Sequence, residues 1–128
     1  MRLCIVLLLA LALTTPERLQ IYVVDVEGGK AMLVVSPTGE SLLVDTGNVG
    51  AGAQRDASRI LAAVHDAGLQ QIDHLVTTHW HGDHFGGMAL LARHIAIREF
   101  IDHGANIQPD PVVDAFLRKT YPVLYRTA

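Results

Sequence analysis

The chain has 128 residues, half of them apolar, which is enough to build the hydrophobic core of one small domain. This composition excludes an intrinsically disordered tail. The formal net charge is −3 at pH 7, and the Lys and Arg residues are scattered singly along the sequence. Neutralising the phosphates of a nucleic acid requires a basic stripe, so the charge pattern argues against nucleic acid as a partner.

The start of the chain differs from the rest and predicts a cleaved signal peptide over residues 1–15. Met1 and Arg2 give a positive start, and an unbroken apolar run follows. A membrane-spanning helix needs about 20 apolar residues, so this run is too short to span a membrane. Cys4 is the only cysteine and lies in the run, so the mature chain 16–128 has no disulfide. We therefore expect an exported protein, either periplasmic or extracellular.

The first part of the mature chain is predicted to be an antiparallel meander of three strands. Leu19–Val26 and Ala31–Ser36 are rich in β-branched and apolar residues, and a glycine-containing turn separates them. A second turn signal at residues 37–40 precedes a third strand at Ser41–Asp45.

The pattern changes after a predicted loop at Thr46–Gln54, because the apolar residues then follow helical spacing. Asp56 is expected near the start of the first helix and Gly68 just past its end, as capping predicts. We expect helices around Ala57–Val64, Met88–Ile95 and Val112–Thr120, the last of them capped by Asp110, and strands at Ile72–Thr77 and Arg98–Asp102. Strands that alternate with helices indicate an α/β (α+β) domain, with a sheet covered by helices.

Four potential metal ligands fall within six residues, directly after a predicted strand: His79, His81, Asp83 and His84. In an extended segment His79 and His81 point the same way and can bind one ion. Gly82 lets the chain turn, so that Asp83 and His84 reach a second ion. Imidazoles and a carboxylate fit zinc, with iron or manganese also possible.

The segment Thr78–Gly87 resembles the His-x-His-x-Asp-His signature of the metallo-β-lactamase superfamily, and Leu43–Gly47 resembles the Asp-containing strand end that precedes it. The resemblance runs from about Ile21 to Gly104. It implies an αββα sandwich with a dinuclear site at one edge, and a hydrolase that activates water.

The resemblance also implies a role for each site residue. His79 and His81 would bind the first metal, and Asp83 and His84 the second. Asp45 would hold the metal-binding loop by hydrogen bonds. Asp83 could also receive and pass on a proton as a catalytic residue. The expected substrate is a small molecule or an ester or phosphodiester.

Family members complete the site with a further histidine, a bridging aspartate and a last histidine, all downstream of the signature. We therefore expect residues 16–128 to be the N-terminal part of the catalytic domain, and the chain as given to be an inactive fragment. The weaker alternative is that His103 or Asp110 replaces one of these downstream ligands. Trp80 either lines a substrate mouth or shields the metal-binding loop.

Within the superfamily, Asp25–Lys30 is similar to the strand and turn of the competence-related DNA-uptake branch, with Lys30 in place of that branch's second aspartate. Two functional alternatives remain at this point. Leu42–Gly47 also looks like the catalytic segment of an aspartic protease, with Asp45 as its aspartate, although mostly strands should then follow. The other alternative is a metal-binding protein without catalysis.

Overall fold

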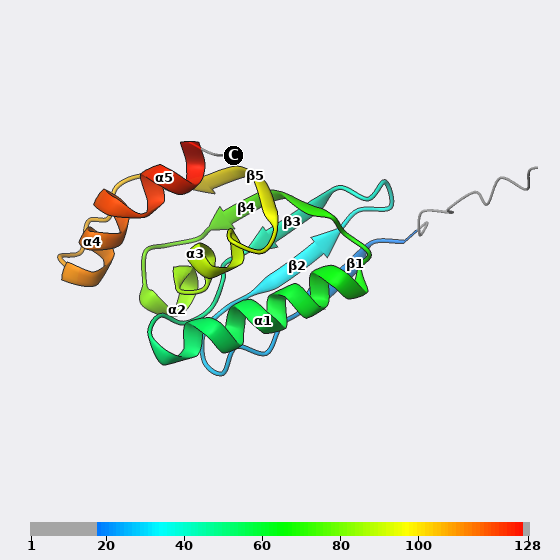
Figure 1. Cartoon of the computed structure of the whole chain (residues 1–128), viewed down its shortest axis with the longest axis horizontal. Coiled ribbons are helices and arrows are strands. Elements are labelled where there is room, and N and C mark those ends of the chain that lie inside the picture. The colour runs from blue at the N-terminus through cyan, green and yellow to red at the C-terminus, as the bar shows by residue number, and fades with distance from the viewer. Residues whose placement is uncertain (1–17, 127–128) are drawn as a thin grey trace, which may run out of the picture.

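The computed structural model describes residues 18–126, which form a five-stranded sheet with helices against one face (Figure 1). The predicted signal peptide lies outside the described residues. The strands lie side by side in chain order: β1 (Gln20–Val23), β2 (Met32–Val35), β3 (Ser41–Val44), β4 (Gln71–Thr77) and β5 (Ala96–Asp102). The helices are α1 (Ala51–Asp66), α2 (Gly82–Phe85), α3 (Met88–Leu91), α4 (Pro111–Lys119) and α5 (Tyr121–Arg126). The mixed α/β architecture predicted from the sequence is confirmed.

The sheet is antiparallel in its first half and parallel in its second half. β1, β2 and β3 form the predicted meander, whereas β3–β4 and β4–β5 pair in parallel. Parallel neighbours need crossover connections, and α1 and the α2–α3 segment supply them. The carboxyl ends of β3, β4 and β5 therefore lie at one edge of the sheet, which is where parallel sheets present their functional loops.

The first helix begins earlier than the sequence pattern indicates. The predicted loop up to Gln54 is wrong, because α1 begins at Ala51 after Gly50, whose φ of 65° lets the chain turn into the helix. Asp56 does not cap the helix. Its fully buried carboxylate lies inside α1 and accepts hydrogen bonds from the backbone and side chain of Asn48 at 2.7 and 2.9 Å. Gly68 follows the helix end as predicted, with a φ of 71°.

The ends of two further elements differ from the prediction, and one helix was not predicted. β1 ends at Val23, because the chain turns away and the Val26 carbonyl accepts from the side chains of Asn48 and Arg55 instead of from a strand. Helix α3 stops at Leu91 and continues only as turns, and α5 was not predicted. The predicted N-cap of α4 is confirmed, since Asp110 Oδ1 accepts from the first-turn amides at 2.8 and 3.2 Å.

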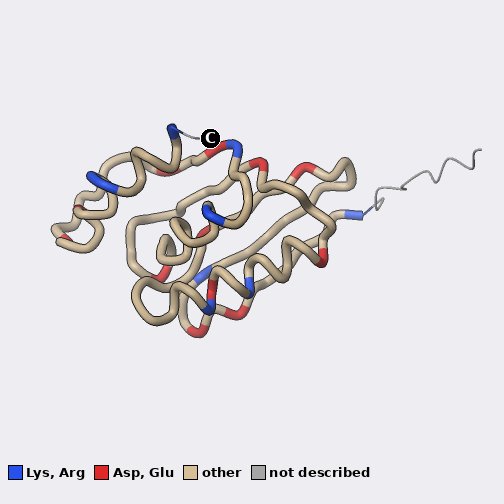
Figure 2. Tube along the Cα trace, in the orientation of Figure 1, with Lys and Arg blue, Asp and Glu red and all other residues tan. Residues whose placement is uncertain are grey.

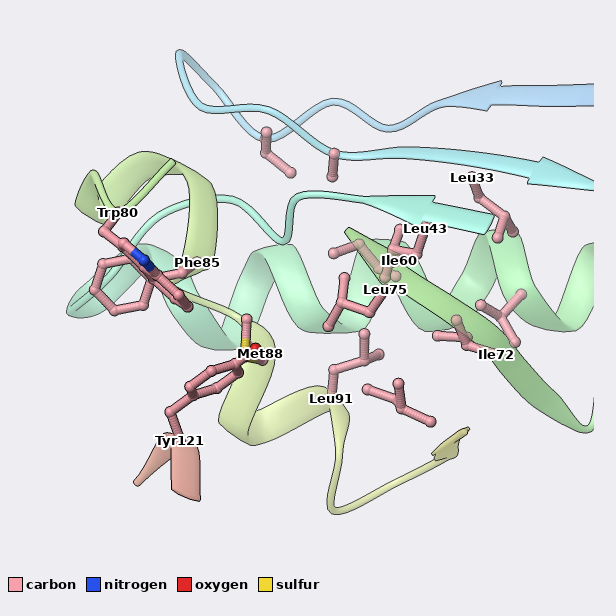
Figure 3. Packing of buried hydrophobic residues seen from close by; sticks show 14 of the residues in the cluster. Leu33, Leu43, Ile60, Ile72, Leu75, Trp80, Phe85, Met88, Leu91 and Tyr121 are labelled. Atoms are coloured by element: carbon pink, nitrogen blue, oxygen red, sulfur yellow. The ribbon is translucent and has the colours of Figure 1, made fainter. Parts of the chain in front are cut away.

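The hydrophobic core lies between the sheet and the helices (Figure 3). Leu33, Leu43 and Leu75 from the strands pack with Ile60 of α1 and Leu91 of α3, and all five side chains are fully buried. An aromatic group joins the end of this core to the last helices; it comprises Trp80, Phe85, Phe100, Phe116 and Tyr121. Within residues 18–126, no helix is long and apolar enough to cross a membrane.

Charged side chains do not gather into a single-sign face in the described chain (Figure 2). Opposite charges meet where α1 passes the loop between β1 and β2. There Arg55 pairs with Glu27, and Arg59 pairs with Asp25 and Glu27 at 3.3 and 3.2 Å. Exposed pairs of this kind contribute little stability singly, but together they hold this loop against the helix.

Candidate metal centre

The histidine cluster lies in the ligand loop, by which we mean residues 78–87, at the carboxyl end of β4. Backbone hydrogen bonds join this loop to the segment after β3. The Thr46 amide donates to the His84 carbonyl at 2.6 Å, and the Gly86 amide donates to the Gly47 carbonyl at 2.8 Å. The Val49 amide donates in turn to the Gly82 carbonyl at 2.8 Å. Two loops from neighbouring parallel strands are thus held as one unit.

Gly86 permits this close approach of the two loops. A Cβ atom at Gly86 would overlap the backbone carbonyl group of Asn48 and the amide nitrogen of Val49. Backbone atoms cannot move aside as the end of a flexible side chain can, so any side chain at this position would separate the loops.

Asp45 lies directly after β3, is fully buried and has a left-handed backbone with a φ of 62°. Its carboxylate accepts hydrogen bonds from the Thr78 amide at 2.8 Å and from the Thr78 hydroxyl at 2.7 Å. The Nδ1 atom of His84 lies 2.8 Å from the same carboxylate. Asp45 therefore fixes both the start of the ligand loop and the orientation of one imidazole, which is the arrangement that its predicted supporting role requires.

The three imidazoles of the ligand loop lie against one another. The ring centroid of His79 is 3.8 Å from that of His84 and 4.6 Å from that of His81. Burial lowers the pKa of His79, and the neighbouring imidazoles of His84 and His81 lower it further. A neutral imidazole is the form that binds a metal, so the packing of the rings favours the metal-binding form of His79.

Hydrogen bonds determine which ring nitrogen remains free on two of these histidines. A carboxylate only accepts, so His84 donates from Nδ1 to Asp45, and in a neutral imidazole the lone pair then lies on Nε2. The Thr78 hydroxyl donates to Asp45, and its oxygen can then accept from His79 Nδ1, 3.1 Å away. The lone pairs of His79 Nε2 and His84 Nε2 are thereby available for a ligand.

The other two predicted ligands are more exposed. The Asp83 carboxylate is 44% exposed and has an oxygen 3.6 Å from His84 Nε2. His81 is exposed, and its Nε2 lies 2.8 Å from Oε1 of Gln108, which comes from the segment after β5. Sequence reasoning singled out neither Gln108 nor Thr78, because neither residue type is a usual zinc ligand.

The structure brings all four predicted ligands into one loop, but their donor atoms do not point at a common position. Within the described range 18–126, no group of three or more His, Cys, Asp or Glu side chains is arranged to hold a metal ion as it stands. The alternative ligands do not complete the site: Asp110 is engaged at the N-terminus of α4, and His103 is exposed with its ring 6.3 Å from that of Trp80. The chemistry of the donor set, three imidazoles and a carboxylate, does fit a transition metal.

Trp80 anchors the ligand loop to the protein interior. Its side chain is only 2% exposed, and its Nε1 donates to the Gly104 carbonyl at 2.8 Å. Its ring packs edge-on against those of Phe85 and Tyr121. Of the two predicted roles for Trp80, the structure therefore favours shielding of the loop over lining a substrate mouth.

The family profile of the metallo-β-lactamase superfamily matches residues 24–111, which include the ligand loop and Asp45. The chain belongs to this superfamily. Among solved structures, it is similar to the subclass B3 metallo-β-lactamase MEM-A1 from a soil metagenome library, with 25% identity and a TM-score of 0.46. It is also similar to the Rm3 metallo-β-lactamase, with 30% identity and a TM-score of 0.46. A comparison with curated proteins found no match.

The matched part is a fraction of each solved structure. The alignment with MEM-A1 covers 66% of this chain and 30% of that one, and the alignment with Rm3 covers 60% of this chain and 28% of that one. The aspartic-protease alternative does not fit the structure. A helix follows Asp45 instead of the strands that such a protease requires, and the Asp45 carboxylate is buried and occupied by hydrogen bonds.

Proposed function

We propose that this protein is a metal-dependent hydrolase with a dinuclear site, most simply of two zinc ions. One observation carries the proposal: the three imidazoles of His79, His81 and His84 and the Asp83 carboxylate gather in one loop at the carboxyl end of β4. Membership of the superfamily supports it. The substrate class that we propose is a small molecule carrying an amide, ester or phosphodiester bond.

The residues of this chain would divide the work as follows. His79 and His81 would hold one ion, and Asp83 and His84 the other, while Asp45 fixes the His84 ring from behind. Bound zinc lowers the pKa of water and polarises the bond to be broken. Asp83 is the one carboxylate of the cluster that reaches solvent, so it can accept and pass on a proton.

The relation to the competence-related branch is a finer proposal, supported by the sequence of Asp25–Lys30. The backbone of this segment touches the site, because the Lys30 amide donates to the Asp83 carbonyl at 3.1 Å. Phosphodiester cleavage in a hydrolase screen would support this branch, and cleavage of lactam rings alone would contradict it.

The metal content of the purified full-length protein tests the main proposal. We expect zinc in the wild type, loss of zinc in His79→Ala, and about 10- to 100-fold weaker zinc binding in Asp45→Ala because the His84 ring loses its support. His65→Ala is the matched control, since His65 is an exposed histidine on α1. Equal metal content in wild type and His79→Ala would contradict the proposal.

A metal-binding protein without catalysis is the second candidate, and substrate turnover separates it from an enzyme. In the full-length protein we expect hydrolysis that His81→Ala abolishes and that Asp83→Asn reduces. Zinc binding without turnover of any ester, lactam or phosphodiester would favour the non-catalytic alternative.

A further inference from the structure

We infer that Gln108 is a positioning residue for the metal centre, which holds the His81 ring by a hydrogen bond at Nε2 and leaves Nδ1 as the atom that could bind a metal. This inference rests on the proposed function, because it concerns the same cluster. Gln108 is not a usual metal ligand and is not part of the signature. It contacts the cluster from the segment that follows β5.

The hydrogen bond sets the position of a proton. The amide oxygen Oε1 of Gln108 lies 2.8 Å from Nε2 of His81, and an amide oxygen can only accept. The proton of the neutral imidazole therefore lies on Nε2, and the lone pair that can bind a metal lies on Nδ1. His79 and His84 differ from His81, because each forms its hydrogen bond through Nδ1.

Gln108 is itself held in place by the preceding residues. The Asn106 side chain bonds both polar backbone groups of Gln108: its Nδ2 donates to the Gln108 carbonyl at 2.6 Å, and its Oδ1 accepts from the Gln108 amide at 3.3 Å. Two residues later, Asp110 begins α4 as its N-cap. The glutamine side chain is therefore presented from a backbone that is fixed on both sides, so less entropy is lost when it bonds His81.

A hydrogen bond also connects the segment before Gln108 to the ligand loop. The Trp80 indole, between His79 and His81 in sequence, donates to the Gly104 carbonyl at 2.8 Å. Asp102 accepts from the Gly104 amide and, at 2.6 Å, from the Tyr121 hydroxyl. Hydrogen bonds thus connect the residues before Gln108 both to the ligand loop and to α5.

All three parallel strands then contribute to the centre at their carboxyl ends. Asp45 follows β3 and orients His84, the ligand loop follows β4, and Gln108 follows β5 and orients His81. The two outer strands supply positioning groups, and the central strand supplies the ligands.

The test compares Gln108→Leu, which removes the acceptor, with Gln108→Glu, which keeps an acceptor oxygen at the same reach. Gln70→Leu is the matched control, because Gln70 is an exposed glutamine before β4. The first readout is the nitrogen-15 spectrum of His81 in the metal-free protein. We expect protonated Nε2 in the wild type and in Gln108→Glu, and a mixture of both tautomers in Gln108→Leu.

The second readout is zinc affinity, measured by competition with a chelator. We expect about 10- to 100-fold weaker binding in Gln108→Leu, recovery in Gln108→Glu and no change in Gln70→Leu. Thermal unfolding of the metal-free variants serves as the folding check, and a shared midpoint assigns the loss to the site.

Two results would overturn the inference: an unprotonated Nε2 on His81 in the wild type, or wild-type zinc affinity together with a wild-type His81 spectrum in Gln108→Leu. Either result would leave the proposed function intact as long as zinc binds. Absence of zinc binding in the wild type would overturn the proposed function, and the nitrogen-15 readout would then decide alone whether Gln108 sets the His81 tautomer.

Discussion

Buried carboxylates in this protein are satisfied by hydrogen bonds rather than left as isolated charges. Asp45 and Asp56 are fully buried, and each accepts at least two hydrogen bonds. Among the described residues, no buried side-chain nitrogen or oxygen lacks a hydrogen-bond partner. Because burying an unpaired carboxylate is costly, these networks largely determine where the surrounding loops lie.

Asp73 on β4 gives this principle a measurable pH dependence. Burial tends to raise the pKa of Asp73, but hydrogen bonds from the amide and hydroxyl of Ser41 and from the side chains of Gln71 and Arg98 outweigh it, so the pKa is lowered from 3.8. A depressed pKa in the folded state means that the carboxylate stabilises the fold above its unfolded pKa. This stability is lost as the pH falls through the folded pKa.

We therefore predict that Asp73→Asn lowers the free energy of unfolding by about 1–3 kcal/mol at pH 7, and that the difference from wild type shrinks as the pH falls below about 4. Urea unfolding at several pH values measures it. Ser41→Ala removes one donor and should move the acid unfolding of the protein to higher pH. A difference that stays constant down to pH 2 would contradict this assignment.

At the scale of elements, the candidate site depends on how closely the ligand loop approaches the segment after β3. Thr46, Gly47 and Val49 exchange backbone hydrogen bonds with the ligand loop, and these bonds leave no room for a side chain at Gly86. The geometry of the site is therefore set by two backbones as well as by the ligands.

We predict that Gly86→Ala destabilises the protein by about 3 kcal/mol, because its Cβ would push the two loops apart, and that it also weakens zinc binding. Gly28→Ala is the control: Gly28 has a φ of 97° but nothing within 4 Å of an added Cβ. It should cost only about 1 kcal/mol, from backbone strain, and leave zinc binding unchanged. Equal effects of the two substitutions on zinc binding would refute the close-approach argument.

At the scale of the whole molecule, the helices among residues 18–126 cover one face of the sheet and leave the other face uncovered. Strand register aligns Val23, Met32, Val44, Val76 and Ile101 in one row across all five strands. None of these side chains belongs to the buried core, and Val23 is 83% exposed. A continuous apolar row of this kind on an open sheet face promotes association.

We predict that the 128-residue chain self-associates in solution through this face and that Val23→Lys reduces the association without loss of secondary structure. Light scattering and circular dichroism measure the two effects. Val112→Lys is the control, since Val112 is 59% exposed but lies on α4. A wild-type chain that scatters as a monomer at high concentration would contradict the prediction.

Local sequence signals predicted most of the elements of this fold, because hydrophobic periodicity and turn residues act over short distances. The strands and the principal helices were identified in this way, and so was the Asp110 cap. The start of α1 was misplaced because Gly50 and Gly52, on either side of its first residue, are typical of a loop. The buried position of Asp56 depends on a tertiary contact with Asn48.

The candidate ligands could likewise be selected from the sequence, since His79, His81, Asp83 and His84 form a dense cluster after a strand. What only the tertiary structure decided is how these side chains are held. The resemblance indicated Asp45 as a support of this loop, but its bonds to Thr78 and His84, and the bond of Gln108 to His81, join residues 27 to 39 positions apart along the chain. The pairing of parallel strands creates such contacts, and because no local periodicity records them, they emerge only when the sheet is assembled.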